Sequence, residues 1–453
     1  MVKMGVAGKE VRLGIIGLGG RGRGQMKTLL SMPDVQVTCV CDLYEDRVQA
    51  GIDICREMKG NEPVGTKRYR EVLTRDDVDA VVVMTSWTTH LHIATEALRA
   101  GKRVAMEVGG AASVDECWQL VRTSEETGIP VMLLENCCYN REEMALLNMV
   151  KQGLFGELVH CAGGYQHDLR EEIGNGDLAR HYRQDNFLNR NGDLYPTHEL
   201  GPIAKMLNIN RGNRMLTLTS TASKARGLSA WLKERRGDSE LSKAHVTQGD
   251  IVTTVIKCAH GETIVLTHDC TLPRPYSRGL RVQGTKGIYM EDNQSIFLEG
   301  KTQPKFDEWL EKNRAELEKN HKGENMDEVI ERLRNSAPDW LHEWEKFDGY
   351  LKEYEHPLWK VYQEFGLRGG HGGMDYLVLR AFVESVQNQT EPPIDVYDAA
   401  SWLVITCLSE QSVAMGGAPV AIPDFTDGNW ICREAEEPNA YGLSKVFWEK
   451  FED

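Results

Sequence analysis

The amino-acid sequence predicts an α/β protein with two domains, the first of which is a parallel sheet covered by helices on both faces. Through the first third of the chain, short apolar runs alternate with helix-length segments, as in successive β-α units. From about Glu157 strand-like alternation takes over with few helices between the strands, which indicates an open, mainly antiparallel sheet. A chain of 453 residues is too long to fold around one compact hydrophobic core. We expect domains over residues 1–155 and 156–453.

The segment from Val11 to Asp42 carries the most specific short motif of the first domain. Its parts run in the order strand, Gly17-Leu18-Gly19-Gly20-Arg21-Gly22, helix, strand and acidic residue. In a dinucleotide site, Gly17 permits the turn out of the strand, Gly19 admits the pyrophosphate, and Gly22 lets the helix pack closely. The N-terminus of the helix then faces the phosphates. The sequence therefore predicts a Rossmann domain.

Asp42 ends the second strand, twenty residues after Gly22. A carboxylate there accepts hydrogen bonds from the ribose hydroxyls and repels a 2′-phosphate, so NAD is expected rather than NADP. Ligands of such sheets lie beyond the carboxyl ends of the strands, which makes the residues after the next three strands further candidates. These residues are Trp87, Thr88, Thr89 and His90, then Glu107 and Val108, then Glu135 and Asn136.

The composition argues against several other classes of function. A formal net charge of -15 disfavours a surface for nucleic acid or an anionic membrane, because phosphate binding needs clustered cations. The first strand begins without an apolar signal core before it, and no apolar run reaches about eighteen residues, so a cytoplasmic protein is expected. The 11 cysteines are scattered, which favours buried thiols over disulfides or a zinc site. No metal site is predicted.

The last third of the chain contains a charged segment followed by apolar helices. Residues from Asp307 to Leu351 are rich in Glu, Lys and Trp and have the pattern of charged helices. We interpret the region at about 301–360 as a solvated helical insertion or an oligomer contact, and expect a homo-oligomer. Segments 374–387 and 397–415 have the pattern of helices that close over a core.

Polar aromatic and ionisable residues are dense between residues 163 and 201. Their spacing fits neither one helix face nor one strand face, so we expect a wall of loops, followed by a helix that begins at residues 196–198. A histidine is suited to proton transfer near neutral pH, so the histidine of this set is the candidate for catalysis. The set is Tyr165, Arg183, Tyr195 and His198, and His198 is that candidate.

Longer motifs give a resemblance to a known family. They are GGYQHDLR at 163–170, RNGDLYPTHELGP at 190–202, LENCCY at 134–139, TLPRPYSR at 271–278 and GGHGGMDYL at 369–377. With them the chain resembles the Gfo/Idh/MocA oxidoreductase superfamily, and more closely glycoside hydrolase family 109, the NAD-dependent α-N-acetylgalactosaminidases. The resemblance implies NAD contacts at Gly20, Arg21, Asp42, Trp87, Thr88, Thr89, His90, Glu107, Val108 and Asn136. It implies sugar contacts at Tyr165, Arg183, Tyr195, Pro196, Thr197, His198 and Tyr276.

Two positions depart from the patterns of these families. Dehydrogenases of the superfamily usually carry Glu-Lys-Pro with a catalytic lysine, whereas this chain has Glu107-Val108-Gly109. Family 109 usually has Tyr-Pro-Thr-His-Gly, whereas here Glu199 follows His198. The first departure favours the hydrolase branch. The second is expected to put a carboxylate beside the histidine.

The resemblance implies a glycosidase without net redox change. Hydride transfer from C3 of the sugar to NAD is followed by loss of the C2 proton, elimination at C1, addition of water and return of the hydride. His198 and Tyr165 are the candidates for the proton transfers, and Glu135 either orients the nicotinamide ribose or assists the histidine. Two alternatives stay open: an NAD-dependent sugar or polyol dehydrogenase of the superfamily, and a non-catalytic sensor of NAD and sugar.

Overall fold

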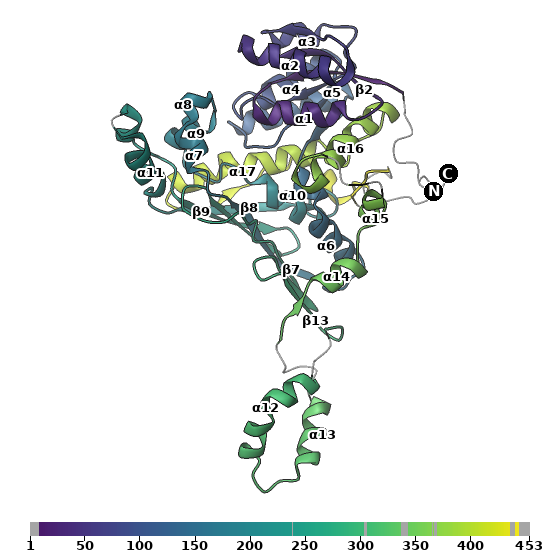
Figure 1. The fold of residues 1–453 in the computed structure, drawn as a ribbon, viewed down its shortest axis with the longest axis vertical. Coiled ribbons are helices and arrows are strands. Elements are labelled where there is room, and N and C mark those ends of the chain that lie inside the picture. The colour runs from purple at the N-terminus through teal and green to yellow at the C-terminus, as the bar shows by residue number, and fades with distance from the viewer. Residues whose placement is uncertain are drawn as a thin grey trace.

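The protein is described by a computed structural model of residues 9–237, 239–302, 306–336, 343–364, 366, 369–434 and 440–443. Two β-sheets organise these residues (Figure 1). The first sheet has strand order β3-β2-β1-β4-β5-β6, and the second has strand order β14-β13-β12-β11-β7-β10-β9-β8-β15. The α/β architecture expected from the sequence is therefore confirmed.

All strand pairs recorded in the first sheet are parallel, and the strand order reverses between β1 and β4. Its strands are β1 (Val11–Ile16), β2 (Val35–Cys41), β3 (Val64–Thr66), β4 (Ala80–Val83), β5 (Arg103–Met106) and β6 (Val131–Leu133). Its helices are α1 (Gly20–Leu30), α2 (Glu45–Lys59), α3 (Tyr69–Leu73), α4 (His90–Arg99) and α5 (Val114–Thr127). The sequence did not predict β3, because this strand has only three residues, none of them buried.

The second sheet is mainly antiparallel, as expected, and among its described pairs only β7 and β10 run parallel. Its longer strands are β7 (Leu158–Gln166), β8 (Met215–Ala222), β9 (Ile251–Cys258) and β10 (Thr263–Asp269). Its shorter strands are β11 (Arg281–Gly284), β12 (Gly287–Met290), β13 (Ser295–Leu298), β14 (Glu345–Lys346) and β15 (Val420–Ala421).

The expectation of few helices between these strands was wrong. Five helices lie between β7 and β9, and three of them have four to seven residues, which is too short for an apolar periodicity to appear in the sequence. The five are α7 (Arg170–Gly174), α8 (Gly176–Ala179), α9 (Arg183–Asn189), α10 (Thr197–Met206) and α11 (Gly227–Arg236).

The charged segment forms a helical hairpin that projects away from both sheets (Figure 1). It consists of α12 (Phe306–Asn320) and α13 (Met326–Ser336), and Arg334 pairs with Asp307 across it at 2.7 Å. Helices α14 (Asp348–Glu353) and α15 (Pro357–Glu364) follow it. None of the helices in the described residues is long and apolar enough to span a bilayer. All 11 cysteines are free and nine are buried, as the sequence indicated.

Helix α17 (Val396–Ala414) contacts elements of both sheets, and helix α16 (Met374–Asn388) packs on the side of the first. Helix α17 packs against α5 of the first sheet and β8 of the second. Helix α16 packs against α1 and against the short 3-10 helix η1 (Asn136–Tyr139), which follows β6 and leads into α6 (Arg141–Lys151). The carboxyl end of β6 therefore lies at the junction of the two sheets.

Helix α10 lies against β7 and η1 at this junction, and two glycines permit the close approach. A Cβ added to Gly163 in β7 would lie 1.8 Å from Cγ of Glu199. A Cβ added to Gly201 would lie 2.9 Å from Cγ of Glu135. Because real Cβ atoms do not approach so closely, a side chain at either position would push α10 away. The two glycines thereby fix the place of His198 at the start of this helix.

Gly163→Ala should lower the free energy of unfolding by about 1 to 3 kcal/mol, the usual range for overpacking a core. Gly163→Ala combined with Glu199→Gly should be destabilised less than the sum of the two single variants, because the second change removes the clashing atom. Gly24→Ala is the control, since its added Cβ meets no atom within 4 Å. Thermal melts of the parent protein, the two single variants and the double variant measure the coupling, and strict additivity would contradict the clash.

Candidate active site

The turn between β1 and α1 forms a cradle of backbone amides. Gly17 has φ of +101°, and an added Cβ would lie 2.5 Å from the carbonyl oxygen of Met84. A Cβ on Gly22 would lie 2.1 Å from the carbonyl oxygen of Gly17, so both positions require glycine. Around Gly20, in contrast, an added Cβ meets no atom within 4 Å, and no side chain caps the first turn of α1. The free N–H groups of this turn border open space, where a pyrophosphate fits.

Asp42 lies beside this turn at the end of β2. Its Oδ2 accepts a hydrogen bond from the N–H of Leu18 at 2.8 Å. Arg47 approaches the carboxylate to 3.9 Å, but its Nη2 donates to the carbonyl oxygen of Ala179 in the second domain at 3.1 Å. The end of β2 therefore presents a carboxylate that is fixed in place by the glycine turn.

Arg21, the second residue of α1, connects three segments of the chain. Its Nε donates to Glu107 at 2.9 Å, and its two Nη atoms donate to Asp375 at the start of α16 at 2.8 and 3.1 Å. Asp375 also accepts a hydrogen bond from the side-chain amide of Asn136 at 2.7 Å. Burial raises the pKa of Asp375, but His371 and Arg21 lower it by more, to well below its usual range. The sequence analysis did not identify Asp375, whose only signal was its place in the GGHGGMDYL motif.

The loop after β4 contributes a buried indole. Trp87 Nε1 has no hydrogen-bond partner among the described residues, and its ring centroid lies 5.6 Å from that of Tyr195. His90 Nε2 is 2.5 Å from a backbone carbonyl oxygen of the same loop, and burial holds the pKa of His90 below its usual value. Thr88 is exposed and Thr89 is half-buried. Of this predicted set, only the indole therefore reaches the aromatic residues of the second domain.

A wall of rings runs along one side of the candidate site. The ring centroids of Tyr165 and Tyr195 are 4.5 Å apart, and His198 lies 5.4 Å from the first ring and 4.8 Å from the second. Tyr276 extends the wall, with its centroid 6.3 Å from that of Tyr165. Burial raises the pKa of Tyr165, so its hydroxyl stays protonated at neutral pH. The fold thus brings together the aromatic residues that the sequence singled out.

Arg183 is the cation of this wall. Its guanidinium carbon lies 5.2 Å from the ring centroid of Tyr195 and 5.8 Å from that of Tyr165. Its Nη1 is 3.2 Å from the carboxylate of Glu172, and its Nε makes no hydrogen bond among the described residues. Arg183 begins α9 and Tyr165 lies in β7, whereas Tyr195 lies in a loop before α10, so the expected wall of loops is built partly on regular elements. The orphaned Nε can donate to a ligand oxygen.

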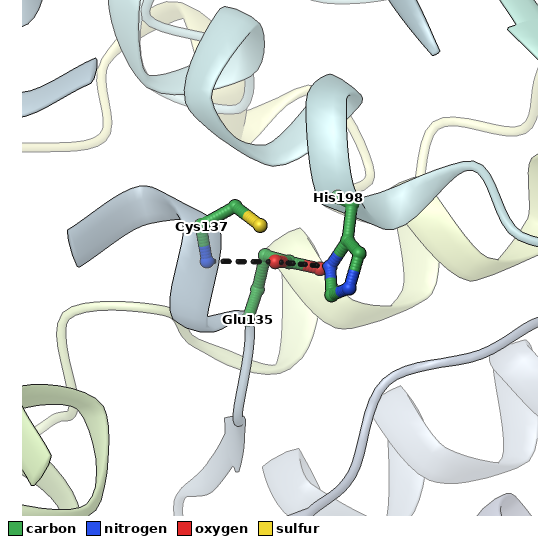
Figure 2. A group of neighbouring side chains, drawn as sticks. All are labelled: Glu135, Cys137 and His198. Atoms are coloured by element: carbon green, nitrogen blue, oxygen red, sulfur yellow. Dashed lines mark hydrogen bonds and ion pairs between the residues drawn. The ribbon is translucent and has the colours of Figure 1, made fainter. Parts of the chain in front are cut away.

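Glu135 and His198 form a pair between the end of β6 and the start of α10 (Figure 2). Oε1 of Glu135 lies 2.8 Å from Nδ1 of His198 and accepts a hydrogen bond from the N–H of Cys137 at 3.0 Å. Burial raises the pKa of Glu135, but His198 and the N–H of Cys137 lower it by more, so the group is a carboxylate. A carboxylate at Nδ1 keeps the proton of the neutral imidazole there and leaves Nε2 as the acceptor. Of the two roles expected for Glu135, the structure thus supports the one on the histidine.

Glu199 does not join the histidine, contrary to the expectation. Its carboxyl group makes no hydrogen bond among the described residues and lies 3.5 Å from Nε of Arg278, which also pairs with Glu143. Burial raises the pKa of Glu199 well above its usual range, and the nearby guanidinium of Arg278 opposes this rise. Arg278 donates from Nη1 to the hydroxyl of Tyr276 at 3.4 Å. Arg278 therefore lies between Glu199 and the hydroxyl of Tyr276 in the wall.

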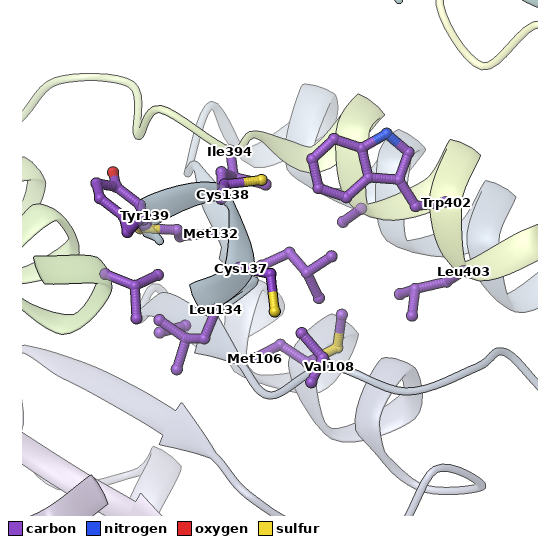
Figure 3. Packing of buried hydrophobic residues seen from close by; sticks show 14 of the residues in the cluster. Met106, Val108, Met132, Leu134, Cys137, Cys138, Tyr139, Ile394, Trp402 and Leu403 are labelled. Carbon is purple, nitrogen blue, oxygen red and sulfur yellow. The ribbon is translucent and has the colours of Figure 1, made fainter. Parts of the chain in front are cut away.

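The place of the dehydrogenase lysine is taken by a core residue. Val108 is buried beside Met106 and Cys137 (Figure 3). A Cβ on Gly109 would lie 2.2 Å from the indole of Trp87. The space that a Lys-Pro pair needs is therefore filled, and this loop offers no ammonium group to a substrate.

Family models match both parts of the chain. A model described as "Oxidoreductase family, NAD-binding Rossmann fold" matches residues 11–134. A model described as "Glycosyl hydrolase 109, C-terminal domain" matches residues 139–327 and 322–432. The two matches agree with the division into a parallel sheet and a mainly antiparallel one.

Curated relatives match nearly the whole chain. An alpha-N-acetylgalactosaminidase of Tannerella forsythia is 37% identical, covering 94% of this chain and 89% of its own. A glycosyl hydrolase family 109 protein of Stenotrophomonas maltophilia is 39% identical, covering 94% and 91%. The WlbA dehydrogenase of Bordetella pertussis, solved with NADH and UDP-GlcNAcA, shares the fold with a TM-score of 0.60 at 13% identity over 92% of this chain and 98% of that one. The chain therefore belongs to glycosyl hydrolase family 109, and its first domain is the NAD-binding Rossmann domain of the Gfo/Idh/MocA oxidoreductases.

Proposed function

We propose that the protein is an NAD-dependent glycosidase that hydrolyses α-N-acetylgalactosaminides and leaves NAD oxidised after each turnover. The observation that carries the proposal is the buried Glu135–His198 pair. It holds the imidazole against the rings of Tyr165 and Tyr195 in the tyrosine wall, at the edge of the NAD-binding domain. Membership of family 109 supports glycoside hydrolysis, and the T. forsythia relative supports the choice of sugar and anomer.

The first domain fits NAD. The uncapped turn at Gly19 to Gly22 would hold the pyrophosphate, and the fixed carboxylate of Asp42 would accept from the adenosine ribose. Arg21 and Asn136, which both donate hydrogen bonds to Asp375, would line the part of the site that binds the nicotinamide ring. When bound, NAD supplies the transient oxidation of C3 that makes the C2 proton of the sugar acidic.

His198 is the proposed base. Because Glu135 holds the proton of the neutral ring at Nδ1, Nε2 is free to accept a proton from the sugar. Tyr165, whose hydroxyl stays protonated, is the proposed donor. Loss of the C2 proton expels the group at C1 by elimination, and water that adds at C1 completes the hydrolysis. A proton returns to C2 as the water adds at C1, and the hydride and the hydroxyl proton that C3 lost on oxidation return to C3 and its oxygen in the last step.

Arg183 and the flanking rings are the proposed sugar clamp. The unpaired Nε of Arg183 would donate to a hydroxyl or an acetamido oxygen. Tyr195 and Tyr276 would contact the apolar faces of the sugar ring. Pro196 and Thr197 are buried at the start of α10, so they would act on the sugar by shaping the pocket.

A dehydrogenase that releases NADH is the less supported alternative. Its relatives of known structure share only the fold with this chain. The buried Val108 stands where those enzymes usually keep a lysine. No separate observation favours a non-catalytic sensor.

NAD should bind more tightly than NADP, and Asp42→Asn should narrow the difference by about 1 to 3 kcal/mol. The amide keeps the acceptor for the N–H of Leu18 but removes the charge that repels a 2′-phosphate. Titrations of both cofactors, followed by tryptophan fluorescence, measure the two dissociation constants. Equal affinities in the unmutated protein would contradict the assignment of Asp42.

Turnover of an aryl α-N-acetylgalactosaminide should consume no NAD. In heavy water the C2 hydrogen of the released sugar should be replaced by deuterium, because the base exchanges its proton with solvent between elimination and addition. Mass spectrometry of the product measures this exchange. A product that keeps its full C2 protium would exclude elimination, and NADH formed in proportion to product would identify a dehydrogenase.

His198→Ala should lower kcat and kcat/KM together by roughly 100-fold to 10,000-fold, the usual span for a general base. Arg183→Lys should act mainly by raising KM, because a group that only holds the sugar binds the ground and transition states alike. Tyr165→Phe keeps the ring and removes only the donor, so it should lower kcat. Near-normal kcat in His198→Ala would show that another group carries the proton.

A further inference from the structure

We propose that Glu135, Cys137 and His198 form a binding site for a zinc-class divalent metal ion, and that occupancy of this site switches the enzyme off. One ligand atom from each residue lies within 4.8 Å of the other two (Figure 2). The sequence predicted no metal site, because its cysteines show no paired spacing. The fold assembles this set from the end of β6, from η1 and from the distant helix α10.

The ligand types select the ion. A thiolate, an imidazole and a carboxylate are the donors that zinc takes in proteins, and three protein ligands leave a fourth position for water. Magnesium and calcium prefer oxygen alone. Zinc bonds of about 2.0 to 2.3 Å put neighbouring ligand atoms about 3.3 to 3.8 Å apart, so the three ligand atoms, now within 4.8 Å of one another, have to close by about 1 to 1.5 Å on binding.

One ligand atom is already orphaned. Oε2 of Glu135 is fully buried and makes no hydrogen bond among the described residues, whereas Oε1 keeps the N–H of Cys137. Binding of the ion would satisfy Oε2 without breaking that backbone contact. His198 keeps 13% of its side chain exposed, which gives an ion a route from the substrate side.

The charges balance when the metal binds. When the ion binds, the thiol of Cys137 releases its proton to solvent. The resulting thiolate and the carboxylate of Glu135 together neutralise the divalent cation. The imidazole of His198 binds as the neutral ring. A neutral assembly is far less costly to bury than a lone thiolate or a lone metal ion.

Inhibition follows from the tautomer of the histidine, and this step rests on the proposed function. In the metal-free pair, the proton lies on Nδ1 and Nε2 accepts. A metal ion on Nδ1 leaves the ring proton on Nε2, which can then only donate. The same residues that make His198 a base therefore remove its basicity when they hold zinc.

The test uses the tag-free full chain in a Cys432→Ser background, because Cys432 is the exposed thiol. Cobalt(II) replaces zinc as a probe, since a cobalt–thiolate bond gives an intense near-ultraviolet absorption band. We expect this band at about one ion per chain. Cys137→Ala should abolish the band and weaken zinc binding, measured by competition with a chromophoric chelator, by roughly 10-fold or more. Cys138→Ala removes the neighbouring buried thiol and should keep both the absorption band and the zinc affinity.

A missing band in the parent protein, or a band that persists in Cys137→Ala, would overturn the site. If Cys137→Ala does not fold by near-ultraviolet circular dichroism, His198→Gln serves instead, and unchanged zinc affinity in that variant would also overturn it. Zinc should inhibit glycoside hydrolysis and a chelator should restore it. A protein that binds cobalt through Cys137 but hydrolyses no glycoside refutes the proposed function while leaving the metal site standing; an active protein without the band refutes the metal site alone.

Discussion

The hydrogen bond between Glu135 and His198 is the interaction on which the site depends. Its carboxylate follows the last strand of the parallel sheet, and its imidazole comes from a helix that packs on the other sheet. Neither domain has the pair by itself, so the geometry of the histidine reports how the two sheets are packed. The hydrogen bonds of Arg21 with Asp375 likewise join distant parts of the chain, because they connect α1, just after the glycine turn, with α16.

The sequence predicted most of the first domain, because parallel strands buried on both faces are continuous apolar runs and the glycine turn has a fixed spacing. The mainly antiparallel sheet was indicated by strands such as β9 and β10, in which buried and more exposed residues alternate over most of seven or eight residues. The missed elements are short. Strand β3 has three residues, and α9 has seven, so neither contains enough periods for its pattern to emerge.

The candidate site was predicted in its members but not in its pairings. His198 and Glu199 are neighbours in sequence, but successive residues of a helix point about 100° apart, so the carboxyl group turned toward β7. The carboxylate that reaches the histidine is Glu135, 63 positions earlier. Asp375 lies 354 positions from Arg21, and only the folded structure shows that its carboxylate binds the guanidinium of Arg21. Sequence patterns identify side chains that can take part in catalysis or binding. Which distant residues pair with them is decided by the packing of the domains.

The projecting helical hairpin has a practical consequence for engineering the protein. Strand β13 ends at Leu298 and β14 begins at Glu345, yet the two strands pair directly, with Ile296 opposite Glu345. The excursion between them is thus a long loop whose ends are held together by the sheet, and the entropy of closing such a loop changes only slowly with its length. The segment is therefore a natural point at which to exchange the hairpin for a fluorescent reporter or an affinity module, with the tyrosine wall and the nucleotide turn left untouched.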